Sequence, residues 1–178
     1  GEIATRNPDM DSSYRLMQKL MAEHPEVTAV LCLNDLMAYG AIQAISDKGS
    51  FMELNGAFGT SAVTGLTQIG GSTVGVTALN GVLDVDSCSK AARFVRFCDA
   101  FSIPVVTLVD AKEFTSVREA SKLSNAYSEA TTAKITVITG EAYGPVYVAI
   151  AGRGANADYT MAWANAVVCP LAPQTAAM

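Results

Sequence analysis

The strongest constraint on the fold is an alternation of strand-like and helix-like stretches that begins after Phe51. Two segments rich in β-branched residues, 63–69 and 73–79, flank the tripeptide Gly70-Gly71-Ser72. Glycine permits the positive φ of a tight turn, so we expect a β-hairpin here. Helical and strand-like periods then alternate, which predicts the helix Asp86–Phe101, the strand Val105–Val109, the helix Ser116–Ala130, the strand Lys134–Thr139 and a further helix after Pro145.

Local signals support these helices. In the first, Ala91, Val95, Cys98 and Phe101 form an apolar stripe, and Asp86 or Ser87 is the expected cap. The segment 116–119 has the pattern of a capping box. A strand–helix–strand–helix order is typical of an α/β domain with a parallel sheet. The segment 159–163 alternates as a further strand would.

Before Phe51 the pattern predicts a helix–strand–helix segment. Asp11, Ser12 and Ser13 can cap a helix that ends at His24-Pro25. An apolar strand, 27–33, and a second helix, from Asn34-Asp35 to Ile45, follow, and the polar residues 47–50 interrupt the pattern. We therefore predict two units, a helix–strand–helix segment over 1–48 and an α/β domain over 49–178.

Composition excludes several function classes. Half of the 178 residues are apolar, enough for a sizeable core, and the net charge is 12 − 17 = −5. This charge provides no basic field for nucleic acid or anionic lipid, so neither is an expected partner. Apolar stretches such as 103–109 are shorter than the roughly 20 residues that cross a bilayer, and no secretory signal is visible at the start. We predict a cytoplasmic location.

Cysteine and histidine usage argues against metal and nucleophilic chemistry. Cys32, Cys88, Cys98 and Cys169 are scattered in apolar surroundings without a C-x-x-C pair, so we expect buried reduced thiols. The single histidine, His24, precedes a proline where a helix should end, which favours a surface or C-cap position. No metal site is predicted, and any chemistry must proceed without imidazole.

The run from Asp84 to Phe101, DVDSCSKAARFVRFCDAF, resembles a known family. It is similar to the C-terminal half of the carboxyltransferase component of biotin-dependent acyl-CoA carboxylases and decarboxylases, which has the crotonase-like (ClpP/crotonase) fold of ββα units. Supporting segments occur in the family's order, and the likeness extends over about residues 50–172. These segments are 50–54, 69–76, 127–131, 134–139 and 142–144.

The resemblance implies transfer of CO₂ between N1 of biotin and the α-carbon of an acyl-CoA thioester. Such chemistry requires fixed N–H donors for two developing oxyanions and no side-chain acid or base. The implied partners are an acyl-CoA substrate and a biotin carboxyl carrier protein that bears the biotin cofactor. The resemblance places the biotin-side oxyanion donors at Gly144 and Val146, and the biotin-binding residues at Tyr143, Gly144, Pro145, Val146 and Val148.

The sequence departs from the family in three respects. Pro145 stands where many relatives have glycine, and it has no N–H to donate. The segment 110–115 lacks the glycine-rich elements common after this strand. The chain also contains one half of a two-half component, so we expect it to lack the N-terminal half that binds CoA. Because the family forms its site between subunits, we expect a homo-oligomer that buries apolar residues of 143–148 and 163–171.

Residues 10–46 resemble a different family, the lac-repressor-type regulators and periplasmic sugar-binding proteins. The segments 14–17, 20–30 and 34–41 carry this likeness, and it implies that Asp35 hydrogen-bonds sugar hydroxyls. The alternative is that Asp35 is only an N-cap. A chimera or fusion is therefore possible, and the alternative functions are a sugar-binding or regulatory receptor fragment and an inactive chimeric or designed fragment.

Other signals are weaker. Neither Gly70-Gly71 nor the segment 151–155 has the spacing of a nucleotide-binding loop. Lys90, Arg93 and Arg96 share a helix, so they are either a basic patch toward the phosphates of CoA or a solvated helix face.

Overall fold

The computed structural model describes residues 9–27, 30, 32, 35–46, 51–152 and 156–171. Its described residues form a seven-stranded sheet of order β1-β2-β3-β4-β5-β6, and β7 also pairs with β5. The strands are β1 Met52–Leu54, β2 Ala62–Ile69, β3 Ser72–Leu83, β4 Val105–Phe114, β5 Lys134–Tyr143, β6 Tyr159–Ala162 and β7 Val167–Cys169. The helices are α1 Met10–Glu23, α2 Asp35–Ile45, α3 Val85–Ala100, α4 Val117–Glu129 and the π-helical turn η2 Tyr147–Ala151.

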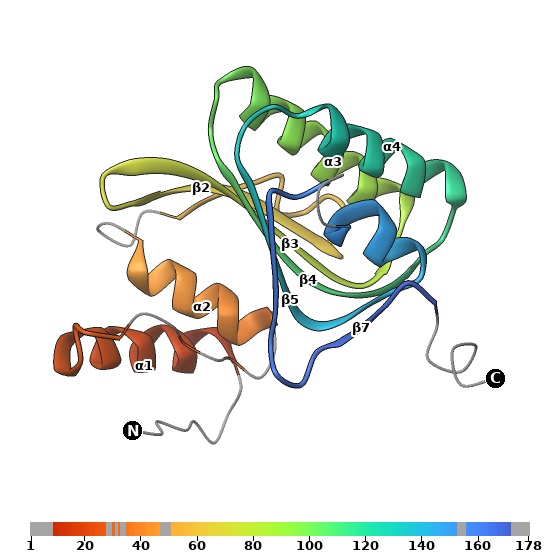
Figure 1. Cartoon of the computed structure of the whole chain (residues 1–178). Coiled ribbons are helices and arrows are strands. Elements are labelled where there is room, and N and C mark those ends of the chain that lie inside the picture. The colour runs from red at the N-terminus through yellow and green to blue at the C-terminus, as the bar shows by residue number, and fades with distance from the viewer. Residues whose placement is uncertain are drawn as a thin grey trace.

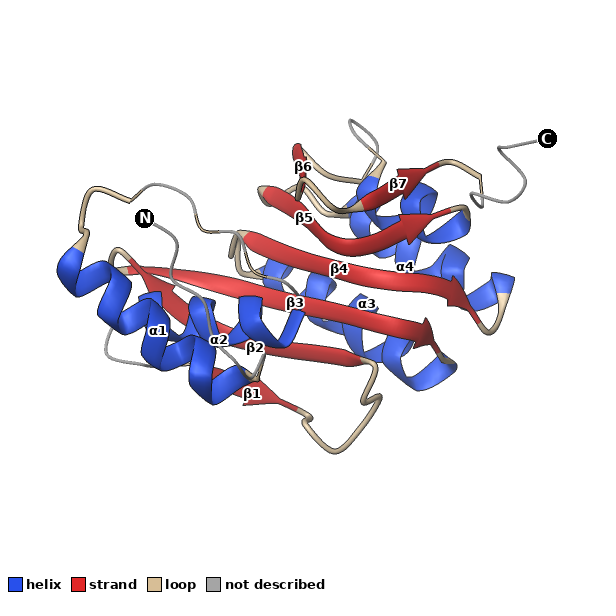
Figure 2. Cartoon of the chain, turned by 90° about the horizontal axis from the view of Figure 1, so that it is seen from below, coloured by secondary structure: helices blue, strands red, loops and turns tan. Residues whose placement is uncertain are grey.

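Helices cover both faces of this sheet. Figures 1 and 2 show α3 and α4 on one face and α1 and α2 on the other. Because both faces of the sheet are covered, successive residues of the central strands are apolar. This explains the nearly continuous hydrophobic runs of these strands. None of the described helices is long and apolar enough to cross a membrane.

The predicted hairpin is confirmed. β2 and β3 pair antiparallel from Ala62↔Leu79 to Ile69↔Ser72. Gly70 and Gly71 form the turn between them, with φ of 58° and 78°. Two successive residues with positive φ define the turn geometry that matches the twist of a hairpin, and side chains other than those of glycine, asparagine and aspartate rarely occupy it.

The predicted parallel sheet is also confirmed. β3 pairs with β4 and β4 with β5, both in parallel, with Val105 opposite Lys134. α3 connects β3 to β4, and α4 connects β4 to β5. The domain is therefore an α/β fold in which a hairpin leads into parallel strands joined by helical crossovers.

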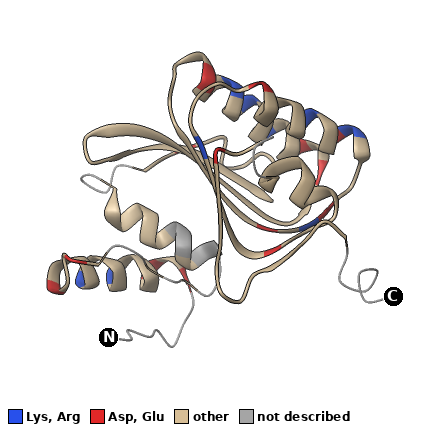
Figure 3. Ribbon diagram, viewed as in Figure 1, with Lys and Arg blue, Asp and Glu red and all other residues tan. Residues whose placement is uncertain are grey.

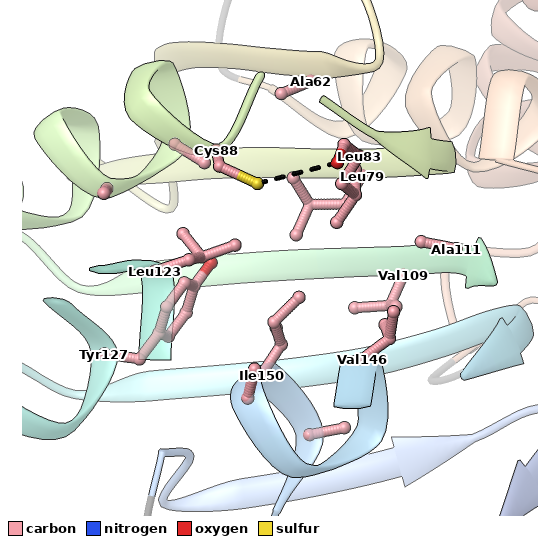
Figure 4. Close-up of a cluster of buried hydrophobic side chains, with 14 of the residues drawn as sticks. Ala62, Leu79, Leu83, Cys88, Val109, Ala111, Leu123, Tyr127, Val146 and Ile150 are labelled. Carbon is pink, nitrogen blue, oxygen red and sulfur yellow. Dashed lines mark hydrogen bonds between the residues drawn. The ribbon is translucent and has the colours of Figure 1, made fainter. Parts of the chain in front are cut away.

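Rows of side chains across the parallel strands build the core. Leu79, Val109 and Ile138 are register partners and belong to the cluster under α3, α4 and η2, which Figure 4 shows. The adjacent row, Ala78–Leu108–Val137, belongs to the cluster that contains Met37, Ala41 and Ile42 of α2. Successive residues of a strand thus serve opposite cores.

The predicted helix caps were displaced by a few residues. The carboxylate of Asp9, rather than residues 11–13, caps α1 by accepting the Ser12 N–H at 2.8 Å. Asp84, rather than Asp86 or Ser87, caps α3 through the Ser87 N–H at 2.7 Å. In both helices an aspartate three residues before the bonded N–H provides the geometry of an N-cap.

The capping box predicted for 116–119 does not form. Ser116 occupies the N-cap position of α4, but its side chain makes no capping hydrogen bond. The carboxylate of Glu119 instead accepts a hydrogen bond from Lys122 Nζ at 2.8 Å. An ion pair one helical turn along has replaced the reciprocal contact to the N-cap.

Three strands extend well beyond their predicted ends, and β3 runs to Leu83 rather than to residue 79. β4 continues from Val109 to Phe114 because β3 remains available as a partner, with Gly81 opposite Ala111 and Leu83 opposite Phe114. β5 likewise continues beyond Thr139 to Tyr143, and the turn follows at Gly144. The predicted strand 27–33 lies largely outside the described residues, and the described Val27, Val30 and Cys32 are not in a strand.

Candidate functional site

The carboxyl ends of the parallel strands bring polar residues to one edge of the sheet. Asn80 of β3 lies opposite Asp110 of β4, and Glu141 belongs to the end of β5, just before the turn at Gly144. In open α/β sheets this edge is where ligands bind, because loops and helix starts converge there. The biotin-side residues expected from the sequence lie at this edge.

Asp110 fixes the geometry of the edge. The pairing register of β4 and β5 shifts between Val109 and Ala111. Asp110 Oδ1 accepts a hydrogen bond from the Glu141 N–H at 2.9 Å, so a side chain serves the backbone where the ladder is irregular. The carboxylate also lies against Gly140, where a Cβ would lie 2.3 Å from Oδ1. Gly140 is therefore required for this close approach.

Lys112 and Glu141 form an ion pair across the same two strands, with Nζ 3.1 Å from Oε2. The hydrogen bond to Glu141 is the main cause that raises the pKa of Lys112, and the charge of Glu141 adds to it. The lysine side chain is more than half exposed, so solvent screens the pair. We assign it a role in ordering the edge rather than in proton transfer.

The turn after β5 has the shape expected for a loop that approaches a ligand closely. Gly144 has φ +56°, and no heavy atom lies within 4 Å of the position that a Cβ would take, so space beside the turn is open. Pro145 follows at the start of the helical turn, and the Val148 N–H donates to the Gly144 carbonyl at 3.2 Å. Pro145 and Val148 are exposed.

The two backbone amides expected to stabilise an oxyanion differ in availability. The Gly144 N–H donates to the carbonyl of Cys169 in β7 at 3.0 Å. Val146 is fully buried, and its N–H makes no hydrogen bond to the part of the chain that the structure describes. Val146 thus has the unused donor, while β7 occupies the other. The sequence did not reveal the contact with β7, because three residues of strand carry too weak a periodic signal.

Three of the four cysteines are buried as expected, and the histidine also agrees with the sequence expectation. Cys32, Cys88 and Cys98 are buried and unpaired, and Cys169 is partly buried. Burial raises the pKa of Cys32 to about 11 and that of Cys88 and Cys98 to about 12, which disfavours the nucleophilic thiolate. His24 is the exposed C-cap of α1. Within the described ranges no group of three metal-ligating residues occurs.

An apolar cavity with a volume of about 550 Å³ lies between α1, α2 and the sheet. Its lining includes Met17, Cys32, Val106 and Trp163. The lining residues that the structure describes include no carboxylate, lysine, arginine or histidine, so they offer no charged group for catalysis. The backbone of Asp35 begins α2, but its side chain is outside the described part of the chain, so its predicted role in sugar binding stays a prediction.

The hairpin and the parallel strands joined by helical crossovers form a crotonase-like α/β domain. The sequence pattern of the "Carboxyl transferase domain" family matches residues 34–178. The chain therefore belongs to the carboxyl transferase domain family. The match begins at α2, within the predicted segment 1–48.

Several known proteins are similar to the chain. The propionyl-CoA carboxylase beta chain of Roseobacter denitrificans is 44% identical over 141 residues, which cover 71% of this chain and 28% of that protein. The methylmalonyl-CoA decarboxylase subunit alpha of Propionigenium modestum is 32% identical over 96% of this chain and 36% of its own length. The chain thus spans about a third of the length of the curated relatives that it matches.

A solved structure shares the fold. A crystal structure of transcarboxylase 12S, a hexamer with hydrolysed methylmalonyl-coenzyme A bound, superposes with a TM-score of 0.71 at 37% identity. The match covers 76% of this chain and 30% of that chain. These findings favour the carboxyltransferase interpretation over the sugar-binding alternative.

Proposed function

We propose that this chain is the biotin-side part of a carboxyltransferase that moves CO₂ between carboxybiotin and the α-carbon of an acyl-CoA. The observation that carries the proposal is the family match over residues 34–178, together with a shared fold at 37% identity. Biotin, when bound, supplies the ureido nitrogen that carries the carboxyl group. The residues of this chain bind and orient that group.

The strand-edge turn is the proposed binding element. The open space beside Gly144 leaves room for a ring, and the unused N–H of Val146 is a donor for a developing oxyanion. Because Val146 is fully buried, the proposal requires the turn 144–148 to shift when biotin binds. Gly144 is the residue that can absorb such a change in backbone angles.

The proposal includes partners outside this chain. An acyl-CoA needs a binding surface, and we propose that a second, N-terminal carboxyltransferase half provides it. A biotin carboxyl carrier protein would deliver the biotin, and a homo-oligomer would bring the halves together. The exposed apolar side chains of Val148, Val167, Val168 and Leu171 support an association surface on this side.

NMR titration with free biotin tests the proposal. We expect biotin to shift the backbone resonances of 143–148, and we expect Val148→Asp to weaken this binding. Val117→Asp is the matched control, because Val117 is 84% exposed on α4, outside the strand-edge turn. Shifts confined to other regions would contradict the proposed site. If thermal unfolding shows that a pentose alone stabilises the chain, and Asp35→Ala removes this effect, the receptor alternative is favoured instead.

A further inference from the structure

A second pocket lies on the β1 side of the sheet, between α3 and the segment that follows β1. Its volume is about 400 Å³, within the range of small-molecule sites. Strand order places it beside β1 and β2, whereas Gly144 follows β5. We call it the Lys90 groove, and its lining residues are Leu54, Asn55, Phe58, Thr64, Lys90, Arg93, Phe94 and Phe97.

The helix presents one stripe to this groove. Lys90, Arg93, Phe94 and Phe97 follow the spacing i, i+3, i+4 and i+7, which places them on one face of α3. Arg96 faces elsewhere, because its guanidinium donates to Asn125 Oδ1 at 3.0 Å and lies 4.0 Å from Glu129. Figure 3 shows charged residues of both signs along α3 and α4. The basic residues of α3 therefore divide into an α4-facing arginine and a groove-facing pair.

Lys90 is the anomalous member of the pair. Its side chain is 3% exposed, yet its Nζ makes no hydrogen bond to any residue that the structure describes. Burial lowers its pKa, and the carboxylate of Glu53 opposes this effect without forming an ion pair with it. An ammonium withdrawn from water without a partner is costly, so buried charges are normally paired or ligand-bound.

The other lining residues suggest what the partner is. Arg93 is exposed and can add a second cation above the buried one. Phe94 and Phe97 stack with ring centroids 6.5 Å apart, and Phe58 and Phe97 leave about two fifths of their surface in solvent. A cationic end beside an aromatic wall matches a ligand with an anionic group attached to a planar ring.

We propose that the Lys90 groove binds a phosphate ester of a planar base, with its phosphate between Lys90 and Arg93 and its ring against Phe97. This ligand chemistry is found both in free nucleotides and in the nucleotide end of larger cofactors. Glu53 is the competing anion, because its carboxylate acts on Lys90 when no ligand is present. The proposal does not depend on the biotin-side function.

Calorimetry and NMR with AMP as the probe test the proposal. We expect AMP to shift the resonances of 90–97 at about 1 mM and to bind about tenfold more tightly than adenosine or inorganic phosphate alone. Desulfo-coenzyme A is the second probe and represents the larger cofactors. If it binds more tightly than AMP, the groove is assigned to the nucleotide end of such cofactors. Absence of shifts in 90–97 with both nucleotides would overturn the proposal.

Variants separate the ligand site from a purely structural lysine. Arg93→Gln changes an exposed residue and should weaken AMP binding about tenfold, as should Lys90→Met, which keeps the buried length without charge. Arg96→Gln is the matched control and should leave binding unchanged. Glu53→Gln should tighten binding by removing the competing carboxylate. Equal AMP affinity in Arg93→Gln, Arg96→Gln and the unmodified chain would contradict the assignment, whether or not Lys90→Met folds.

Discussion

Asp110 Oδ1 accepts a hydrogen bond from the Glu141 N–H at 2.9 Å, where the register between β4 and β5 shifts. The same carboxylate occupies the space that a side chain at Gly140 would need. Asp110 and Gly140 thus act together to hold the ends of β4 and β5 in place. Their coupling can be measured.

Gly140→Ala should lower the free energy of unfolding by about 1–3 kcal/mol, because its new methyl group would collide with Asp110. In an Asp110→Ala background the same substitution should cost less, because the obstructing carboxylate is gone. Chemical denaturation of the four proteins of this double-mutant cycle gives the coupling energy. Additive costs would show that the two residues act independently.

Tyr127→Phe should destabilise the protein by about 1–3 kcal/mol, because a buried hydrogen bond is lost. The Tyr127 hydroxyl is fully buried and lies 2.8 Å from Thr107 Oγ1, and its burial raises its pKa to about 12. Tyr159→Phe, at an exposed position, is the control. Thermal unfolding compares them, and an equal effect of the two substitutions would refute the assignment.

Asp99 should make stability depend on acidity. Hydrogen bonds from the backbone N–H of Thr132 and of Thr131, at 3.0 and 2.7 Å, lower the pKa of its carboxyl below the usual 3.8. Its contribution is therefore present above pH 3.8 and lost as the pH falls through the lower folded-state value.

Urea denaturation of Asp99→Ala at several pH values checks this dependence. The difference in stability from the unmodified protein should be largest near neutrality and should narrow on acidification. Asp84→Ala, which removes the carboxylate that caps α3, should behave in the same way, because its capping hydrogen bonds to Ser87 lower its pKa. A difference that stays constant with pH would contradict the role assigned to these carboxylates.

Val148→Asp should abolish self-association without unfolding the chain. Val148 is 59% exposed, so a charge there costs little in an isolated protomer but much inside an apolar interface. Light scattering over a concentration series measures the mass, with Val117→Asp as the control. A monomer at every concentration in the unmodified chain would leave no interface for the substitution to disrupt.

The sequence predicted the sheet well because each element carried its own local signal. The glycines at 70 and 71 located the hairpin, and an apolar stripe located α3. The extension of β4 to Phe114 could not be predicted, since it depends on β3 as a distant pairing partner. Strand ends are decided by neighbours in space rather than by local propensity.

The candidate site was predicted in part. The family resemblance placed the biotin-side residues at Gly144 and its neighbours, and the positive φ of Gly144 shows a turn at that position. The occupation of the Gly144 amide by Cys169 depends on a contact across 25 residues that no local pattern encodes. The burial of Lys90 was equally inaccessible, because a lysine on a helix normally faces solvent.

The two rows of core residues mean that both faces of β4 are packed against a hydrophobic cluster. Leu108 belongs to the cluster on the α2 side, and Val109 belongs to the cluster on the α3 and α4 side. Neighbouring residues of β4 are therefore constrained by packing on opposite faces of the sheet. In descendants of this sequence, substitutions along 105–111 should accumulate slowly at every position rather than at every second one. The variability of the sequence along β4 would then not show the two-residue period by which strands are usually recognised.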